Sequence, residues 1–284
     1  MSRRVCILLL FAAGAISAQP RRIVSTAPSI TEMLFALGLG DRVVGVTTYC
    51  RYPPAALQKP KIGGYTEPSI EAIAALRPDL VIIQKNPVQL QAKLERVGLK
   101  VLEVRHDDID GVYGSIQRIG AATGASASAA ALVASMRRDL NAVHARVAKL
   151  PSRRIMFVVG RAPNRLEDLV VVGRASFLNE LMQLAGGVNV FRDAVAPYPK
   201  VGTEELLARD PEVIVDMGDM ANTVGVTEEH KRSVVALWNR YPSLSAVRNH
   251  RVYAVAADIY VVPGPRMVQA AAAFARMLHP EAGG

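Results

Sequence analysis

The chain lacks the usual signatures of catalysis. It contains no Gly-x-Ser-x-Gly nucleophile elbow, no phosphate-binding loop and no His-Glu-x-x-His zinc motif. Gly38-Leu39-Gly40 begins like a dinucleotide-binding loop, but the next glycine, Gly45, comes too late, so we assign these glycines to turns. The five histidines lack the spacing of metal ligands; they occupy positions 106, 144, 230, 250 and 279. We therefore predict no catalytic residue and no metal site.

Two smaller features still carry residues capable of chemistry. His106-Asp107-Asp108 follows a predicted strand, at the carboxyl end where open α/β sheets bind ligands. This cluster either contacts a ligand or metal, or forms a solvated loop. Cys50 could act as a nucleophile, but no motif with a histidine accompanies it. We therefore interpret Cys50 as a small buried hydrophobe.

Tyrosines in loops are the clearest candidates for ligand contact. Aromatic residues make up only 5% of the chain, yet five tyrosines lie near Pro or Gly in predicted loops of both halves: Tyr49, Tyr52, Tyr65, Tyr198 and Tyr260. A phenol ring buries a large area at low conformational cost and keeps a polar tip. Such rings suit a large flat ligand, for example a macrocycle with amide or carboxylate arms. The alternative is that individual rings pack a loop against its lobe, as Trp238 on a predicted amphipathic helix is expected to pack in the core.

The composition excludes several classes of protein. The chain is 50% hydrophobic and 21% charged, which is ample for a packed core and excludes intrinsic disorder, collagen and coiled coil. The net charge is +9, but the basic residues are scattered in pairs without interleaved aromatic residues, so we predict no nucleic-acid partner. Two cysteines are too few for a disulfide scaffold.

Predicted strands alternate with predicted helices in both halves of the chain, which is typical of parallel sheets. Between the halves, residues 126–150 contain no Gly or Pro and carry apolar side chains at helical spacing, which predicts a helix roughly 37 Å long. The sequence thus predicts an α/β protein of two Rossmann-like lobes with parallel sheets, residues 22–125 and 151–284. The single long backbone helix, residues 126–150, joins them.

An internal repeat supports two similar lobes. Residues 69–82 align without gaps on residues 202–215, so that Pro78 falls on Pro211 and Glu71 falls on Glu204. Each half therefore carries the same helix-Pro-strand element, as two pseudo-symmetric lobes require.

The first eighteen residues are typical of a cleaved secretory signal. Arg3 and Arg4 precede an apolar run over residues 5–13, and small residues follow as far as Ala18. The run is shorter than the roughly 20 apolar residues that span a bilayer. Cys6 lies inside the run without a preceding pair of small residues, so we do not expect a lipoprotein. The exported protein then keeps Cys50 alone.

Several segments resemble a known family. They are Ala27-Pro28-Ser29-Ile30-Thr31-Glu32, residues 45–54, 76–81 and 186–191, and Pro263-Gly264-Pro265-Arg266. The chain from Ile23 to about Pro280 resembles the periplasmic substrate-binding proteins of ABC importers that carry a helical backbone between two lobes. The Tyr49-Cys50-Arg51-Tyr52-Pro53-Pro54 segment makes it most similar to the cobalamin-binding members rather than the siderophore-binding ones.

The resemblance implies a periplasmic receptor that captures a corrinoid between two lobes and performs no chemistry. Its only bound group would be the cobalamin that it transports. Tyr49 matches the tyrosine that stacks on the corrin ring, while Tyr65 and Tyr198 stand where relatives have tryptophans, as does Gln84. The full set of ligand-binding residues implied in this way is Pro28, Tyr49, Tyr65, Tyr198, Asp258, Ile259, Tyr260, Val261 and Val262.

The resemblance also implies a partner. A monomeric receptor would deliver its ligand to an ABC permease dimer with its ATPase, and Glu71 and Glu204 match glutamates that dock onto arginines of that dimer. The alternative is that both are ordinary acids at helix starts, favoured by the helix dipole. Two other functions stay open: capture of haem, with iron held through a Tyr or His, and an exported metal-dependent enzyme built on the same scaffold around His106-Asp107-Asp108 and Asp258.

Overall fold

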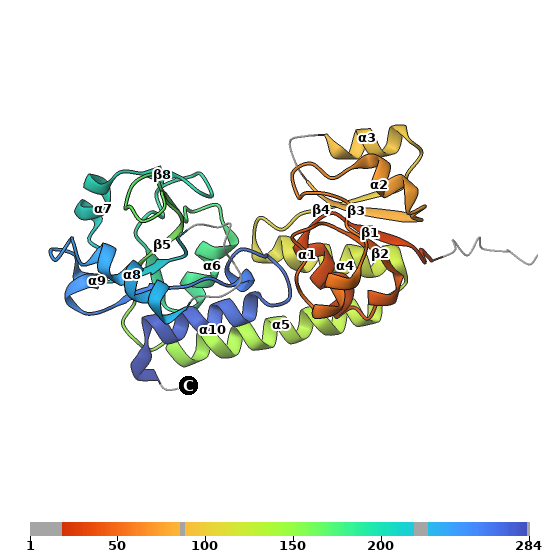
Figure 1. The fold of residues 1–284 in the computed structure, drawn as a ribbon. Coiled ribbons are helices and arrows are strands. Elements are labelled where there is room, and N and C mark those ends of the chain that lie inside the picture. Colours follow the sequence, from red (N-terminus) through yellow and green to blue (C-terminus); the bar gives the residue numbers. More distant parts are fainter. Residues whose placement is uncertain (1–18, 86–88, 219–226, 283–284) are drawn as a thin grey trace, which may run out of the picture.

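Two α/β lobes lie side by side along one long helix, α5 (Ser126–Val147), as Figure 1 shows. The computed structural model describes residues 19–85, 89–218 and 227–282. The arrangement confirms the predicted fold class. Residues 1–18, where the secretory signal is predicted, lie outside the described residues. Within the described ranges, no helix combines the length and apolar character needed to cross a membrane.

A four-stranded parallel sheet in the order β2-β1-β3-β4 forms the first lobe. The strands are β1 (Ile23–Ser25), β2 (Val43–Val46), β3 (Leu80–Gln84) and β4 (Val101–Val104), and the helices are α1 (Pro28–Ala36), α2 (Ile70–Ala75), α3 (Leu90–Arg96) and α4 (Ile109–Thr123). Ile82 belongs to a core cluster shared with α1 and α4, whereas Val81 belongs to one shared with α2 and α3. Neighbouring side chains of β3 thus face opposite helix layers, which is why its sequence is a continuous apolar run.

The second lobe has a mixed sheet in the order β10-β9-β5-β6-β8, with β7 also paired to β5. Its strands are β5 (Arg153–Gly160), β6 (Leu169–Val171), β7 (Gly187–Asn189), β8 (Lys200–Val201), β9 (Val213–Asp216) and β10 (Val252–Ala254). The predicted parallel pairing holds for β10, β9, β5 and β7, whereas β6 runs antiparallel to both β5 and β8. No helix separates β5 from β6, and without a crossover element the chain can only turn back on itself.

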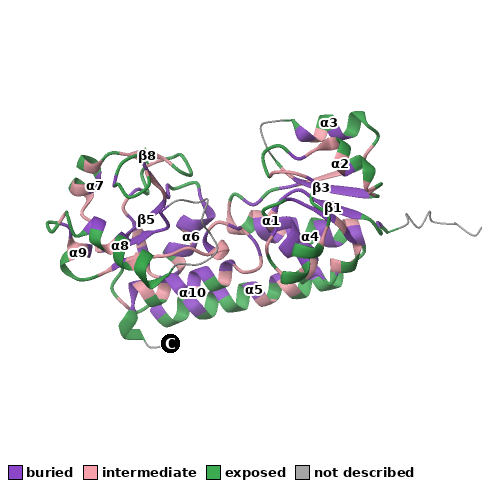
Figure 2. Ribbon diagram, viewed as in Figure 1, coloured by how far each residue is buried: buried purple, intermediate pink, exposed green. Residues whose placement is uncertain are grey.

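Helices complete the second lobe and cover its sheet. They are α6 (Phe177–Leu184), α7 (Thr203–Arg209), α8 (Glu228–Trp238), α9 (Ser245–Arg248) and α10 (Met267–Leu278). Figure 2 shows buried residues along the sheets and on the helix faces turned toward them. Trp238 is fully buried, and its Nε1 donates a hydrogen bond of 2.7 Å to Asp216 Oδ2, which confirms its predicted place in the core.

One face of α5 serves both lobes. Its buried residues recur every three or four positions: Ala129, Val133, Met136, Leu140, Val143 and Val147. This stripe packs against α4 of the first lobe and against α6 and α10 of the second, and all of its residues except Val147 belong to a single hydrophobic cluster. The 22 residues give a rod of roughly 33 Å. The helix ends at Val147 rather than at residue 150, because the chain already turns ahead of Pro151.

The structure bears out the internal repeat. Helix α2 leads into β3, and α7 leads into β9, at matching positions of the two lobes. The equivalence extends to the backbone: Arg77 and Asp210, which align in the repeat, both adopt left-handed conformations, with φ of 45° and 39°. Such a conformation is uncommon outside glycine, so its recurrence at aligned positions indicates the same turn in both lobes.

Candidate functional site

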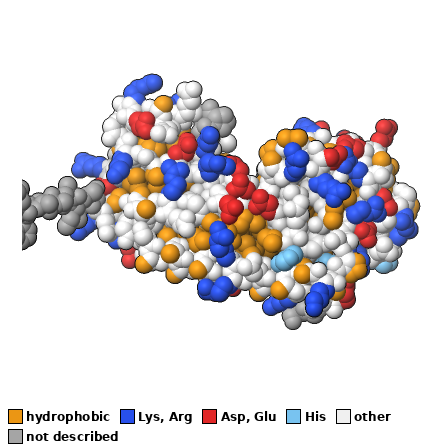
Figure 3. All heavy atoms as spheres, turned by 180° about the vertical axis from the view of Figure 1, so that it is seen from behind, with side chains coloured by type: hydrophobic (Ala, Val, Ile, Leu, Met, Phe, Trp, Pro, Cys, Tyr) orange, Lys and Arg blue, Asp and Glu red, His pale blue; other side chains and the backbone are white. Residues whose placement is uncertain are grey.

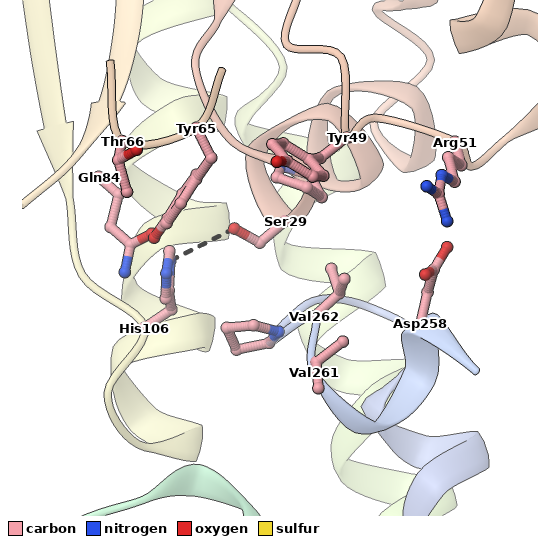
Figure 4. Close-up of a pocket in the computed structure, with 12 residues that line it drawn as sticks. Ser29, Tyr49, Arg51, Tyr65, Thr66, Gln84, His106, Asp258, Val261 and Val262 are labelled. Atoms are coloured by element: carbon pink, nitrogen blue, oxygen red, sulfur yellow. Dashed lines mark hydrogen bonds between the residues drawn. The ribbon is translucent and has the colours of Figure 1, made fainter. Parts of the chain in front are cut away.

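A cavity of about 320 Å³ lies between the first lobe and a loop of the second, as Figure 4 shows. Its lining is two-sided: the first lobe contributes Pro28, Ser29, Tyr49, Arg51, Tyr65, Thr66, Gln84 and His106, and the second contributes Asp258, Val261, Val262 and Pro263. The volume lies in the range of small-molecule binding sites.

The parallel sheet of the first lobe positions one wall of the cavity. Gln84 is the last residue of β3, His106 follows the end of β4, and Ser29 follows the end of β1 as α1 begins. Tyr49 lies in the loop that leaves β2. All four strands therefore deliver lining residues from their carboxyl ends, which is where open α/β sheets bind their ligands.

Tyr65 and Tyr49 are the two aromatic rings in the cavity wall. The Tyr65 hydroxyl donates a hydrogen bond to Gln84 Oε1, which fixes the ring against the end of β3. Burial raises the pKa of Tyr65, and negative charge on Tyr198 and Asp107 raises it further. Tyr49 is 56% exposed, so its ring has most of its surface available to a ligand. Both residues lie where the resemblance places ligand contacts.

His106 reaches the cavity, while its two acidic neighbours do not. Its imidazole is 5% exposed, and burial lowers its pKa to about 4, so it is neutral at pH 7. Asp107 instead points outward and pairs with Arg105 at 3.4 Å. Asp108 accepts a hydrogen bond of 2.6 Å from the Gly111 amide and thereby caps α4. The predicted cluster thus divides into one cavity residue and two surface or capping residues.

The loop over residues 258–263 forms the opposite wall. Asp258, Val261 and Val262 line the cavity, as the resemblance implies, and Figure 4 shows the Asp258 carboxylate directed toward Arg51. Ile259 does not line the cavity; it is partly buried against the hydrophobic core.

Tyr260 does not line the cavity, because its side chain lies in the hydrophobic core. The structure therefore corrects the expectation that Tyr260 contacts the ligand. Its side chain is buried, and its ring lies 5.8 Å from Phe157 and 5.6 Å from Phe274 between centroids. Burial raises its pKa to about 12. The 3-10 turn Asp258–Tyr260 rotates successive side chains to different sides, and an aromatic ring gains most by entering the apolar core.

Tyr198 stands outside the cavity lining as well, but on an open surface. It is 43% exposed, and its hydroxyl accepts a hydrogen bond of 3.2 Å from Ser176 Oγ. The Tyr198 phenol acts electrostatically on Tyr65 and raises its pKa, so the two phenols lie near each other although they belong to different lobes. Tyr198 is therefore placed to meet a ligand larger than the cavity.

Sequence reasoning did not include five of the lining residues among the ligand contacts: Ser29, Arg51, Thr66, Gln84 and Pro263. Four of these are sequence neighbours of residues that it did single out, and neighbouring loop positions commonly share one wall of a site. Gln84 carries a different signal, because it ends a buried parallel strand.

Cys50 is a buried thiol rather than part of the cavity wall. Cys50 is fully buried, Thr31 Oγ1 donates to its sulfur at 3.1 Å, and burial raises the pKa of the thiol. This confirms its interpretation as a small buried side chain. In the part of the chain that the structure describes, no three His, Cys, Asp or Glu side chains are close enough to hold a metal ion.

Acidic side chains gather where the lobes meet on the reverse face, shown in Figure 3. Glu180 of α6 accepts a hydrogen bond of 2.8 Å from the Ile109 amide at the start of α4. Burial raises the pKa of Glu180, and the charges of Asp108 and Asp110 add to this rise. The bond joins the two lobes, because α4 belongs to the first and α6 to the second.

Glu71 and Glu204 occupy matching, exposed positions. Each is the second residue of its helix, α2 or α7, and Figure 1 shows both helices on the side of the molecule turned away from α5. The Glu71 carboxylate accepts hydrogen bonds from its own amide and from Ser69 Oγ, and these bonds lower its pKa.

Comparison with known proteins identifies relatives over nearly the whole chain. A vitamin B12-binding protein of Vibrio cholerae is 29% identical over 94% of this chain and 94% of its own length. The crystal structure of the periplasmic vitamin B12-binding protein BtuF of Vibrio cholerae matches with a TM-score of 0.77 and 28% identity, over 92% of this chain and 98% of that one. A periplasmic haem-binding protein of Pseudomonas aeruginosa matches with a TM-score of 0.75 and 25% identity, over 93% and 94% of the two chains.

The family model for periplasmic binding proteins matches residues 23–259. This match covers the first lobe from β1 onward, α5 and the second lobe as far as residue 259, and it includes the first-lobe wall of the cavity. The two-lobed fold, the cavity between the lobes and this match agree, and the chain belongs to the periplasmic binding protein family.

Proposed function

We propose that this protein is a periplasmic receptor that captures a corrinoid between its two lobes and delivers it to an ABC transporter. The observation that carries the proposal is the cavity between the lobes, where the rings of Tyr49 and Tyr65 face the loop over residues 258–263. The similarity to vitamin B12-binding proteins over most of the chain supports the corrinoid as ligand.

The dimensions of the site fit a ligand that is only partly enclosed. A volume of about 320 Å³ is too small for a whole corrinoid, so the ligand would extend from the cavity into the open space between the lobes. Tyr49 and Tyr198 stand there with 56% and 43% of their surfaces exposed. These rings would lose exposed area on binding, which favours association.

Export and delivery form part of the same proposal. Residues 1–18 would direct the chain to the periplasm and be removed, and the mature protein would act as a monomer. Glu71 and Glu204 would dock onto a permease dimer that works with an ATPase. Exposed ion pairs contribute only about 0.2 to 1 kcal/mol each, so these two would set orientation and on-rate more than affinity.

The family is one of binding proteins, and we propose that this member likewise performs no reaction on its ligand. The alternative of a metal-dependent enzyme needs a cluster of metal ligands in the cleft. His106 and Asp258 are the titratable candidates there, and they line the cavity from opposite lobes.

Haem is the second candidate ligand, and one observation favours it. Tyr65 and His106, whose side chains are common ligands of haem iron, both line the cavity. His106 is neutral at pH 7, which leaves a ring nitrogen able to bind a metal. The solved relative from Pseudomonas aeruginosa is a periplasmic haem-binding protein, which supports this second candidate.

Titration of the purified protein with cyanocobalamin and with haemin separates these candidates. We expect calorimetry to show one cyanocobalamin bound per chain. The Tyr65→Phe variant should keep this stoichiometry and lose only a little affinity. Haem capture would instead give a Soret shift that Tyr65→Phe or His106→Ala abolishes. Failure of both ligands to bind would refute the proposed function.

A further inference from the structure

One arginine joins the two walls of the cavity. Arg266 lies at the start of α10, and Glu32 lies in α1 of the other lobe, 234 positions earlier in the chain. Arg266 Nε donates to Glu32 Oε2 at 3.0 Å, and its Nη2 donates to Glu32 Oε1. The guanidinium therefore grips both carboxylate oxygens, which fixes direction as well as distance.

The same guanidinium contacts both ligand-facing loops. It lies 3.9 Å from the centre of the Tyr52 ring, in the loop that carries Tyr49 and Arg51. Its Nη2 is also 3.9 Å from Asp258 Oδ2, in the loop that forms the opposite wall. Arg266 thus contacts α1, the loop that carries Tyr49 and the loop that carries Asp258 at the same time.

The ion pair between Arg266 and Glu32 is largely buried, so both charges lose hydration when it forms. The side chains of Arg266 and Glu32 are 15% and 3% exposed, and desolvation raises the pKa of Glu32 despite the opposing effect of Arg266. A buried ion pair generally adds little stability compared with apolar side chains of the same size, whereas breaking it is costly. Its advantage over apolar packing is that it specifies one geometry.

The backbone next to Arg266 lies in van der Waals contact with α1. A Cβ added at Gly264 would lie 3.4 Å from Glu32 Oε2 and 3.8 Å from Ser29 Cα. The second-lobe loop therefore passes directly against α1, next to Ser29 of the cavity wall.

We infer that Arg266 is a positioning residue that holds the two cavity walls at a fixed separation before the ligand arrives, through Glu32, Tyr52 and Asp258. The inference rests on the proposed function for its ligand but not for its geometry. With α5 joining the lobes at one place and Arg266 at another, the lobes have little freedom to open or twist. A preorganised cavity spends less free energy on ordering when it binds.

Arg266→Lys tests the inference, because it keeps the charge but removes the two-pronged grip and the contact of the guanidinium with the Tyr52 ring. Arg209→Lys is the matched control: Arg209 also grips a carboxylate, that of Asp193 at 2.8 and 2.9 Å, and covers an aromatic ring, that of Phe191, but all three residues belong to the second lobe, so these contacts do not join the lobes. We expect Arg266→Lys to weaken cyanocobalamin binding about tenfold, and Arg209→Lys to leave it unchanged. Equal affinities for the two variants would overturn the inference.

Tyr52→Leu provides a second variant with little risk to folding, since Tyr52 is 43% exposed. It removes one of the four contacts, so we expect a loss of affinity smaller than that of Arg266→Lys. An unchanged affinity would show that the ring does not take part in positioning.

Spin labels report the separation of the lobes without any ligand. Val97 on the first lobe and Glu229 on the second are exposed and suit replacement by labelled cysteines, while Cys50 is buried. We expect the distance distribution to broaden in Arg266→Lys and to stay narrow in Arg209→Lys. A narrow distribution in both would refute the inference. If neither the wild type nor the variants bound cyanocobalamin, capture of a corrinoid would be refuted. The distance measurement needs no ligand, so it would still test the role of Arg266.

Discussion

The imidazole Nδ1 of His106 lies 3.4 Å from the hydroxyl of Ser29, although 77 positions separate the two residues. The contact brings the end of β4 and the start of α1 together at the cavity. It also leaves the imidazole 5% exposed, beneath a site that is otherwise open to solvent.

The burial of His106 predicts a loss of stability in acid. Its pKa is about 4 in the folded protein and 6.5 when unperturbed, so the unfolded chain binds the additional proton first as pH falls. Stability therefore decreases from pH 6.5 to 4, by about 3 kcal/mol from this residue. Urea unfolding of the wild type and of His106→Gln across this range measures the effect. Parallel pH profiles for the two proteins would contradict it.

Replacement of the cavity rings should reduce affinity without unfolding the protein. Tyr49→Ala removes a ring that is 56% exposed, so we expect weaker cyanocobalamin binding, by about tenfold, and little change in unfolding free energy. Calorimetry and urea unfolding on the same sample separate the two effects. Leu57→Ala is a suitable control, because Leu57 is similarly exposed at 53% and does not line the cavity.

Tyr260→Ala should behave in the opposite way. This ring is buried between Phe157 and Phe274, and loss of a core aromatic ring costs about 3 to 5 kcal/mol. Urea unfolding should show this loss, while Tyr260→Phe should stay close to the wild type because the ring packing is preserved. A large fall in ligand affinity at unchanged stability would show instead that Tyr260 meets the ligand.

Removal of the two equivalent glutamates should reduce delivery of the ligand to the transporter without changing ligand binding. The double substitution of Glu71→Gln and Glu204→Gln removes two exposed charges, and neither residue lines the cavity. We expect uptake of labelled cobalamin into cells to fall several-fold and ligand affinity to remain unchanged. The matched control is Asp139→Asn with Glu229→Gln, which also removes two exposed acids, one of them on α5. Equal uptake by the two double variants would exclude a docking role.

Local patterns predicted the elements that are set by local physics. Strand β4 ends shortly before His106, where the sequence predicts the carboxyl end of a strand. The repeated helix-Pro-strand unit was also visible, because proline and the apolar spacing recur in both halves. The strands β6 and β8 were missed: with three and two residues, they are too short to show a period.

The site was less predictable, because its lining depends on which way each side chain turns. Residues 258–262 were expected as a block, yet the 3-10 turn sends Asp258 into the cavity and Tyr260 into the core. No local pattern encodes that choice, since it depends on the space between Phe157 and Phe274 in distant elements. The ion pair of Glu32 and Arg266 escaped detection for the same reason.

The row of apolar side chains on α5 has a consequence for unfolding. Met136 and Leu140 belong to the same hydrophobic cluster as residues from both sheets, such as Ile82 and Phe157. If one lobe unfolded, α5 would lose part of the apolar side chains that shield it from water. The other lobe packs on the same helix face, so it would be destabilised as well. The two lobes should therefore denature together, in one cooperative calorimetric transition.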